Sequence, residues 1–327
     1  MHFAKRIEGI LKESMENTNL LKHFFKVQND FSSKFIDRDN LSLEEKERLT
    51  QEFSLALHNE VSSLVREINF KHHAKERKNV VKNSILFEGI DCFRYILAIM
   101  NLWGFSPEEF LNAFDDKEAY LDIKYRDDKE WQGQPVVLVD VDDVVAHFRR
   151  GYAEYLNSLD GVQVNIDSPE YYFTEGIPRD RYNPEKIFQD FIEARGLRTL
   201  DPVKDTIESI NQLRKNGFWI HVLTARPYGN HTCKYDSYAW LAQSGLEFDQ
   251  ISFSPEKMIW AAKSKYYDQD KIVCAIDDSP KHAREYAKHG IRVLSPSLSY
   301  NQELIGVENV YMFNEGKEIC SIIKSFK

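Results

Sequence analysis

Hydrophobic and polar positions follow two different patterns along this chain. Up to about residue 125, apolar residues recur with helical spacing in four segments, which span roughly 4–30, 43–70, 79–103 and 106–122. From residue 135 onward, short unbroken apolar runs appear, beginning with Val136–Val139. The first pattern is typical of amphipathic helices, and the second of strands buried on both faces of a parallel sheet. The sequence therefore predicts an N-terminal all-α helical bundle and a C-terminal α/β Rossmann-like parallel sheet.

The segment boundaries carry their own signals. Asp39 to Ser42 interrupts the apolar pattern, and Ser106-Pro107 opens the last helical segment with two glutamates in its first turn. Proline and acidic residues are favoured at helix starts. The charged stretch 124–130 is typical of a linker. We therefore expect a helical domain over residues 1–125, a linker over 126–134 and a second domain over 135–327.

Carboxylates follow two of the predicted buried strands. The run Val136–Val139 leads directly into one acidic group, and Val273–Ile276 leads into another. The carboxyl ends of parallel strands meet at one edge of a sheet, and alternate side chains of a strand point the same way. We therefore expect four carboxylates to converge: Asp140, Asp142, Asp277 and Asp278.

Four carboxylates at one sheet edge would repel one another. Their pKa values would rise unless a cation neutralised them, and an all-oxygen ligand set suits Mg²⁺. Such a metal would gather an anionic group, most naturally a phosphate, and orient it against a carboxylate nucleophile. One acidic pair alone is better explained as a helix cap or a solvated surface. Two pairs that each close a buried strand favour a Mg²⁺ site and phosphoryl transfer.

Two further strands end in groups that suit a phosphate. Residues 217–224 form an apolar run that ends in Thr224, followed by a turn that contains Arg226. The Thr224 hydroxyl could donate a hydrogen bond to a phosphate oxygen, and Arg226 is a candidate substrate-binding residue.

A lysine after the next strand could neutralise phosphate charge. The strand is expected over 250–253, and Pro255 just beyond it predicts a helix with this proline in its first turn. Lys257 in that helix is the candidate, although Lys263 and Lys265 compete for the same role.

The order of these motifs resembles that of the haloacid dehalogenase superfamily of phosphohydrolases. The motifs are DVDD at 140–143, LTAR at 223–226, a lysine, and IDDSP at 276–280, and the resemblance covers about residues 135–327. It implies that Asp140 is the nucleophile that forms an aspartyl-phosphate and that Asp142 is the general acid and base. The TARP turn and the IDDSP ending look most like the 5′(3′)-deoxyribonucleotidase branch.

The same resemblance implies further roles. Thr224 and Lys257 would hold the phosphate, and Asp277, with help from Asp278, would hold Mg²⁺. Asp143 stands where many members of the superfamily carry glycine.

An aromatic segment lies between the first motif and the second apolar run. Residues 146–200 are placed to form a small helical cap over the carboxylates, and caps exclude water and select substrates. We expect Tyr172 and Phe173 to stack on a base. For any one aromatic residue, packing of the cap onto the core is the simpler explanation.

Carboxylates also share a face of the predicted N-terminal helices. Glu88 and Asp91 are three residues apart in an otherwise apolar segment, and Glu60 lies similarly in the segment before it. Carboxylates in a helical core are costly unless they are paired or bind a metal. For each of them alone, a solvated helix face or an ion pair is the simpler explanation.

Taken with Gln28 and Lys71, these carboxylates resemble the all-α NTP pyrophosphohydrolases of the MazG and dimeric dUTPase group. There, E-x-x-E on one helix faces E-x-x-D on another to bind Mg²⁺. The EGID sequence at 88–91 matches the second motif, but Ser63 stands where the first motif has its second glutamate. The resemblance implies that the three carboxylates bind Mg²⁺, that Gln28 contacts a pyrimidine edge, that Lys71 contacts a phosphate, and that the helical domain forms a homodimer.

Composition limits the class of protein. The chain has 327 residues, of which 42% are hydrophobic, enough for two domains that each have a core. The net charge of −9 disfavours a nucleic-acid backbone as the main partner but allows small phosphorylated substrates delivered with Mg²⁺. No stretch has the length and apolarity of a membrane span or signal peptide, so a cytoplasmic protein is expected. The four scattered cysteines are expected to be reduced.

These observations favour a two-domain enzyme that acts on nucleotides. We expect a Mg²⁺-dependent phosphatase of nucleoside (deoxy)monophosphates, fused to an NTP pyrophosphohydrolase-like domain whose product would be the phosphatase substrate. One alternative is a phosphatase of a polynucleotide 3′-end or of another small phosphate. A second alternative is a nucleotide-sensing regulator with a non-catalytic helical domain. The sequence leaves open the base, the sugar and the oligomeric state.

Overall fold

The computed structural model describes residues 19–68, 79–125 and 130–326. The chain divides into two compact units, Met1–Asp115 and Asp116–Lys327, and the division falls within helix α4 (Pro107–Tyr125). Three sequence predictions fall wholly or partly outside the described residues. These are the phosphate contact of Lys71, part of the first helical segment and part of the linker.

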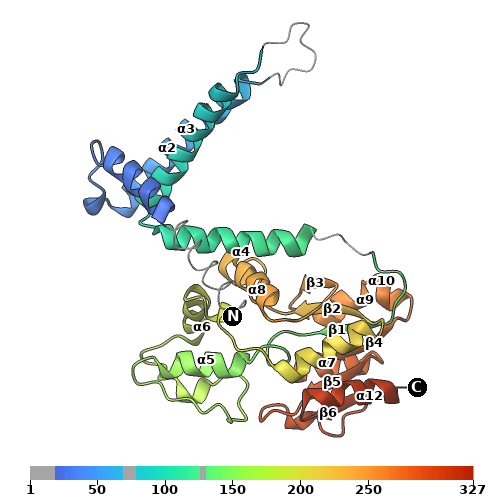
Figure 1. Cartoon of the computed structure of the whole chain (residues 1–327). Helices are drawn as coiled ribbons and strands as arrows, with labels where there is room; N and C mark the ends of the chain where they lie inside the picture. The colour runs from blue at the N-terminus through green and yellow to red at the C-terminus, as the bar shows by residue number, and fades with distance from the viewer. Residues whose placement is uncertain (1–18, 69–78, 126–129, 327) are drawn as a thin grey trace, which may run out of the picture. The chain divides into compact units, whose positions relative to one another are not determined.

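Helices make up the described part of the first unit. Residues 19–32 are helical, and α2 (Leu43–Arg66), α3 (Lys82–Leu102) and the start of α4 follow after the short 3₁₀ helix η1 (Arg38–Asn40). Helices α2 and α3 lie side by side (Figure 1). Residues 19–68 and 79–115 contain no strand, which confirms the predicted all-α class. Among the described helices, none is both long enough and apolar enough to cross a membrane.

Local side-chain interactions set the starts of these helices. Ser42 caps α2 by accepting a hydrogen bond from the Glu45 backbone N–H, while the Glu45 carboxylate accepts one from the Ser42 backbone N–H. Ser106 and Glu109 form the same arrangement at the start of α4. Helix α3 begins later than the apolar pattern predicts, because Val81 has an extended backbone and an exposed side chain.

The second unit is built on a six-stranded parallel sheet. The strand order is β3-β2-β1-β4-β5-β6, and every neighbouring pair is parallel. This confirms the predicted α/β class with a parallel sheet. The strands are β1 (Val136–Val139), β2 (Trp219–Thr224), β3 (Gln250–Phe253), β4 (Ile272–Ile276), β5 (Arg292–Pro296) and β6 (Val310–Phe313).

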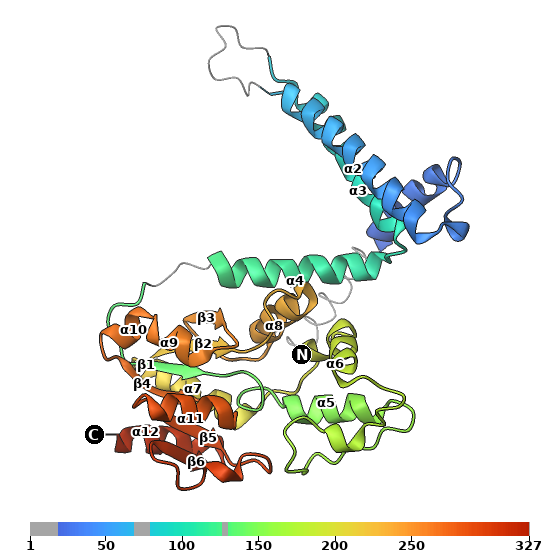
Figure 2. The same ribbon diagram turned by 180° about the vertical axis from the view of Figure 1, so that it is seen from behind.

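Strand β1 lies at the centre of this sheet and is buried on both faces. Val137 and Val139 belong to one apolar cluster, with residues of α7 (Lys204–Lys215), α8 (His231–Gln243) and α12 (Ile319–Ser325). Val136 and Leu138 belong to the other cluster, with residues of α9 (Lys257–Ala262), α10 (Lys265–Asp268) and α11 (Pro280–Lys288). Figure 1 views the face covered by α7, and Figure 2 the face covered by α11. Helices on both faces explain why the β1 sequence is an unbroken apolar run.

The segment between β1 and α7 forms the expected small helical cap. It contains α5 (Phe148–Asn157), α6 (Pro184–Glu193) and the 3₁₀ helices η2 (Thr174–Gly176) and η3 (Gly196–Arg198). Aromatic rings hold α5 and α6 together, as where Tyr152 meets the edges of Phe188 and Phe191. Many of the cap aromatics are therefore packing residues, as the simpler explanation predicted.

The helix after β3 starts later than predicted. Helix α9 begins at Lys257, so Pro255 precedes the helix instead of lying in its first turn. The Ser254 N–H donates a hydrogen bond to the Thr224 carbonyl, which extends the pairing of β3 with β2. The Ser254 hydroxyl then accepts a hydrogen bond from the Glu256 N–H in a tight turn. The helix begins only after this turn is complete.

Candidate active site

Three carboxylates converge at the carboxyl ends of β1 and β4. The Asp140 N–H donates a hydrogen bond to the Ile276 carbonyl, so the pairing of the two strands continues into the acidic segment. Carboxylate oxygens of Asp140, Asp277 and Asp278 lie within 4.8 Å of one another, and all three residues are buried. The structure thus brings together three of the four carboxylates that the sequence predicted to meet.

Lys257 lies between two of these carboxylates. Its side chain is buried, and Nζ is 2.8 Å from Oδ2 of Asp140 and 2.8 Å from Oδ2 of Asp277. Burial alone would lower the Lys257 pKa, but the two carboxylates raise it above its usual value, so the ammonium stays charged. Lys263 and Lys265 are exposed. Of the three candidate lysines, Lys257 is the one placed in the site.

One lysine does not balance three buried carboxylates. Burial raises the pKa of Asp140 to about 6; Asp277 adds to this effect and Lys257 opposes it. Burial also raises the pKa of Asp278 well above its usual value. In addition, Oδ1 of Asp140 is buried without a hydrogen-bond partner among the described residues. The excess negative charge of the three carboxylates fits a divalent cation with oxygen ligands, as predicted for Mg²⁺.

Asp142 is held apart from this cluster by Arg226. The Nη2 atom of Arg226 is 2.6 Å from Oδ1 of Asp142, Nε is 3.0 Å from Oδ2, and Nη1 donates to Ser237. Burial would lower the Arg226 pKa, but Asp142 more than offsets this and raises it. The backbone N–H of Arg226 donates to Oγ1 of Thr224, which is buried at the end of β2. Arg226, predicted to bind substrate, thus lines the cavity as the partner of Asp142.

Two residues next to the carboxylate cluster, Asp143 and Tyr300, are not among the site residues that the sequence predicted. Asp143 has a backbone φ of +52°, the left-handed region in which glycine is favoured. The Asp143 carboxylate accepts hydrogen bonds from the backbone N–H of Arg149 and from the Tyr300 hydroxyl. Burial raises the pKa of Asp143 to about 7. The Tyr300 hydroxyl is also 2.6 Å from Oδ2 of Asp278. Nothing in the sequence links Tyr300 to Asp278, because the contact depends on the loop after β5.

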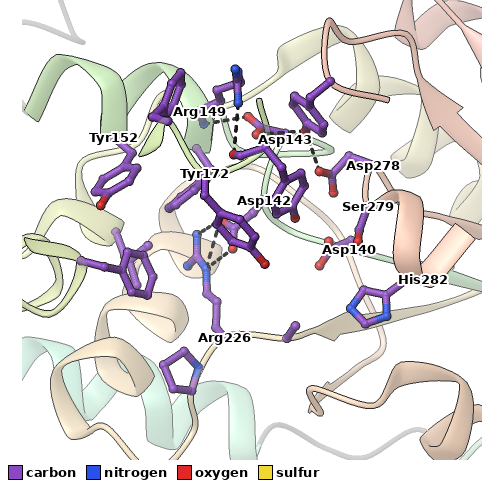
Figure 3. A pocket seen from close by; sticks show the side chains of 18 of the residues that line it. Asp140, Asp142, Asp143, Arg149, Tyr152, Tyr172, Arg226, Asp278, Ser279 and His282 are labelled. Atoms are coloured by element: carbon purple, nitrogen blue, oxygen red, sulfur yellow. Dashed lines mark hydrogen bonds and ion pairs between the residues drawn. The ribbon is translucent and has the colours of Figure 1, made fainter. Parts of the chain in front are cut away.

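These residues open into a cavity of about 550 Å³ beneath the cap. Figure 3 shows Asp140, Asp278 and Ser279 on one side of the cavity and Tyr152 on the other. The size is typical of a site for a small organic ligand. The cap contributes six aromatic residues to the lining: Phe148, Tyr152, Tyr171, Tyr172, Phe173 and Phe188.

The two aromatics predicted to stack on a base differ in exposure. Tyr172 is 72% exposed, whereas Phe173 is 3% exposed and its ring centroid lies 4.0 Å from Cζ of Arg149. The Arg149 guanidinium also fixes the loop that leads into Tyr172. It donates hydrogen bonds to the backbone carbonyl oxygens of Ile166, Ser168, Glu170 and Tyr171. Arg149 thereby positions the wall of the cavity that carries Tyr172.

The helical unit brings together its three predicted carboxylates. Oxygens of Glu60 on α2 and of Glu88 and Asp91 on α3 lie within 4.8 Å of one another. Burial and the charges of these residues raise the pKa of Cys92, which is consistent with an acidic cluster next to its thiol. Ser63, three residues after Glu60, accepts a hydrogen bond from the Arg66 side chain.

Gln28, the predicted pyrimidine contact, is buried against α3. Its Oε1 accepts a hydrogen bond from Nε of Arg94 at 3.0 Å, and its Nε2 donates to Ser32 at 3.2 Å. Both ends of the Gln28 amide are therefore engaged within the unit.

Comparisons with known proteins give structural similarities alone, since no family model and no curated protein matches this sequence. A haloacid dehalogenase-like family hydrolase from Streptococcus pneumoniae is 15% identical with a TM-score of 0.43, covering 59% of this chain and 99% of that one. CbbY from Rhodobacter sphaeroides, in complex with phosphate, is 17% identical with a TM-score of 0.40, covering 57% and 96%. D,D-heptose 1,7-bisphosphate phosphatase from Burkholderia thailandensis is 11% identical with a TM-score of 0.36, covering 59% and 99%.

Proposed function

We propose that the second unit is a Mg²⁺-dependent phosphatase that acts on nucleoside monophosphates through an aspartyl-phosphate. The observation that carries this proposal is Oδ1 of Asp140, which is buried without a hydrogen-bond partner among the described residues, in a carboxylate cluster that faces a cavity. Lys257 fixes the other oxygen of Asp140 at 2.8 Å, so the free oxygen is the one available to react. A carboxylate held in this way is suited to nucleophilic catalysis.

In the first half of the reaction, Oδ1 of Asp140 forms a bond to phosphorus while the bond from phosphorus to the leaving oxygen breaks. Protonated Asp142 gives its proton to that oxygen, and Lys257, which lines the cavity, holds a phosphoryl oxygen. Thr224, predicted to share this role, is fully buried and does not line the cavity. In the second half, water attacks phosphorus, Asp142 takes its proton, and Asp140 is released with inorganic phosphate. The ion pair with Arg226 holds the Asp142 carboxylate at the cavity wall, where it can exchange this proton.

The carboxylates of Asp140, Asp277 and Asp278 would hold Mg²⁺. When bound there, the cation would offset the charge of the cluster and of the phosphate. Without it, an anionic substrate would meet three carboxylates and a single neutralising lysine.

The cap supports a nucleotide as the substrate. Its aromatic side chains line the cavity, with Tyr152 on the side opposite Asp140, and offer flat apolar surfaces for a base. The alternatives are a polynucleotide 3′-phosphate or another small phosphate monoester. A screen of phosphate release over nucleoside mono- and triphosphates, sugar phosphates and 3′-phosphorylated oligonucleotides separates these substrates. Turnover of sugar phosphates in preference to nucleoside monophosphates would contradict the proposal.

Substitution of Asp142 by Asn is expected to slow phosphate release from nucleoside monophosphates by roughly 10²- to 10⁴-fold. The amide cannot exchange a proton with the leaving oxygen or with the attacking water, whereas its hydrogen bonds with Arg226 are partly kept. The loss should be smaller for p-nitrophenyl phosphate, whose leaving group needs no proton. Steady-state rates with both substrates measure this difference, and an equal loss for both would contradict the general-acid role of Asp142.

Mg²⁺ is expected to stabilise the protein more at neutral than at acidic pH. Burial raises the pKa of Asp140 to about 6 and that of Asp143 to about 7. A carboxyl group whose pKa is raised in the folded protein stabilises the fold fully at any pH below its pKa in the unfolded chain. This stabilisation is lost as the pH rises through its pKa in the folded protein. The metal-free protein should therefore lose this contribution between about pH 4 and about pH 7, and a cation bound to the ionised cluster should offset the loss.

Melting temperatures with Mg²⁺ and with EDTA, at about pH 5 and about pH 7.5, test this pH dependence. The Mg²⁺-induced increase should be larger at the higher pH and should disappear in an Asp277→Asn variant. An increase of equal size at both values, or one that survives in Asp277→Asn, would show that the metal binds elsewhere.

For the helical unit, we propose a weak NTP pyrophosphohydrolase-like site and a homodimer through this unit. The convergence of Glu60, Glu88 and Asp91 across two helices supports a metal site there. Exposed apolar side chains on the same helices, such as Leu55 at 73% and Phe87 at 67%, support association with a second copy. Light scattering of the full chain tests the dimer, and a monomer at all concentrations would contradict it.

A Ser63→Glu substitution is expected to increase pyrophosphate release from dUTP, dCTP or dATP. The added carboxylate lies one helical turn from Glu60 and would add a ligand to the cluster, and Mg²⁺ affinity follows the number of charged ligands. The assay uses an Asp140→Asn background, which removes later dephosphorylation. Native activity that Glu88→Gln does not reduce would contradict the proposed metal site.

A further inference from the structure

Two buried polar atoms of the cavity lining lack a hydrogen-bond partner among the described residues. One is Oδ1 of Asp140, which the proposed mechanism uses, and the other is Nδ1 of His282, which it does not. His282 lies in the first turn of α11 and is 7% exposed. Figure 3 shows its ring close to Asp140 and away from Tyr152. This imidazole therefore lies on the carboxylate side of the cavity, away from Tyr152.

The surroundings of His282 define what it can bind. Its nearest acidic oxygen, Oε2 of Glu285, is 3.6 Å from Nδ1 and beyond hydrogen-bond reach. His282 makes no hydrogen bond within the described residues. Its Nδ1 atom is buried from solvent, whereas its Nε2 atom is accessible. Burial and the nearby charge of Lys257 lower the pKa of His282, so the ring is neutral near pH 7. A neutral imidazole has one N–H to donate, and the accessible Nε2 is where a ligand can accept it.

We infer that His282 is a substrate-binding residue whose Nε2–H donates a hydrogen bond to an oxygen of the phosphoryl group held at Asp140. This inference rests on the proposed phosphatase function. A phosphoryl oxygen is the acceptor that fits, because the ring lies near both Asp140 and Lys257 and on the side of the cavity away from Tyr152. The neighbouring Ser279 also lines the cavity, and its side chain does not cap α11. The N-cap residue and the first turn of α11 thus each present a polar side chain to the cavity.

A contact with the phosphoryl group has a consequence that distinguishes it from a contact with the base. His282→Ala should reduce kcat/KM by about 10- to 100-fold, the range for a hydrogen bond to a charged group. The factor should be the same for nucleoside monophosphates with different bases and for p-nitrophenyl phosphate. The affinity for inorganic phosphate in the presence of Mg²⁺ should fall by a similar factor.

Two conservative variants identify the nitrogen that acts. The amide nitrogen of Gln can reach the position of Nε2, whereas that of Asn reaches the position of Nδ1. His282→Gln should therefore recover part of the lost phosphate affinity, and His282→Asn should not. His289→Ala is the matched control, because His289 follows the last turn of the same helix and is exposed.

The experiment measures phosphate binding by calorimetry, steady-state kinetics and melting temperature for the full chain and these variants. Unchanged phosphate affinity and kcat/KM in His282→Ala would overturn the inference. A lower melting temperature with unchanged phosphate affinity would assign His282 to packing, and a loss confined to one base would assign it to base recognition; either result overturns the inference. If the native protein binds phosphate but releases none from any monophosphate, the proposed function fails, while the binding data still decide the role of His282.

Discussion

An Asp140→Asn variant is expected to release no measurable phosphate from nucleoside monophosphates while keeping its fold. The substitution removes the oxygen that would bond to phosphorus, and we expect a loss of roughly 10⁴-fold or more, as for other catalytic nucleophiles. Burial raises the pKa of Asp140 to about 6, so its ionised form destabilises the metal-free fold at neutral pH. The neutral amide should therefore leave the melting temperature unchanged or higher. Phosphate release with Mg²⁺ and thermal unfolding with EDTA measure the two effects.

The matched control for this variant is Asp160→Asn, because the Asp160 side chain is 94% exposed and does not line the cavity. This control should keep both activity and melting temperature. Full turnover by Asp140→Asn would exclude the aspartyl-phosphate. A large decrease in melting temperature would show that Asp140 acts mainly in folding.

Replacing Lys257 by Met is expected to destabilise the metal-free protein by about 3–5 kcal/mol, the usual effect of removing one partner of a buried ion pair. The substitution leaves Asp140 and Asp277 buried without their shared counter-charge, because the Lys257 ammonium lies 2.8 Å from each. Phosphate release should also fall sharply, since a positive charge that would hold the phosphoryl group is lost. Urea unfolding in EDTA, together with the phosphate-release assay, measures both consequences.

Lys263→Met is the control for this prediction, because Lys263 directly follows α9 and is exposed. A double variant with Asp140→Asn should recover part of the lost stability, since one of the two unpaired charges is removed. If Lys257→Met is no less stable than Lys263→Met, the charge balance inferred for the cluster is wrong.

The sheet and its carboxylates could be predicted from the sequence because both depend on local patterns. Val136 to Val139 are buried against helices on alternating faces, so the strand is recognisable as an unbroken apolar run. Asp140, Asp277 and Asp278 follow directly on neighbouring parallel strands, so their convergence follows from the sheet alone.

The partners of these carboxylates could not be predicted in the same way. The ion pair between Asp142 and Arg226 and the hydrogen bond between Tyr300 and Asp278 join loops that are far apart in the sequence. The left-handed backbone at Asp143 is likewise a feature of the folded turn. Such contacts depend on loop conformations, which carry no periodic signal.

In the helical unit, the sequence predicted which carboxylates meet but not which residues bond to Gln28. The spacing of Glu88 and Asp91 places them on one helix face, and the pairing of α2 with α3 brings Glu60 to them. Gln28 instead bonds to Arg94 and Ser32, because its side chain lies within the packed helices.

Chemical trapping of the phosphoenzyme tests the central claim most directly. The full chain would be mixed with Mg²⁺ and a nucleoside monophosphate, quenched in acid during turnover and treated with borohydride, which reduces an aspartyl-phosphate to homoserine. We predict homoserine at position 140, identified by peptide mass spectrometry, and none without Mg²⁺ or in Asp140→Asn. Steady phosphate release with an unmodified Asp140, or with the modification at another carboxylate, would contradict the proposed mechanism.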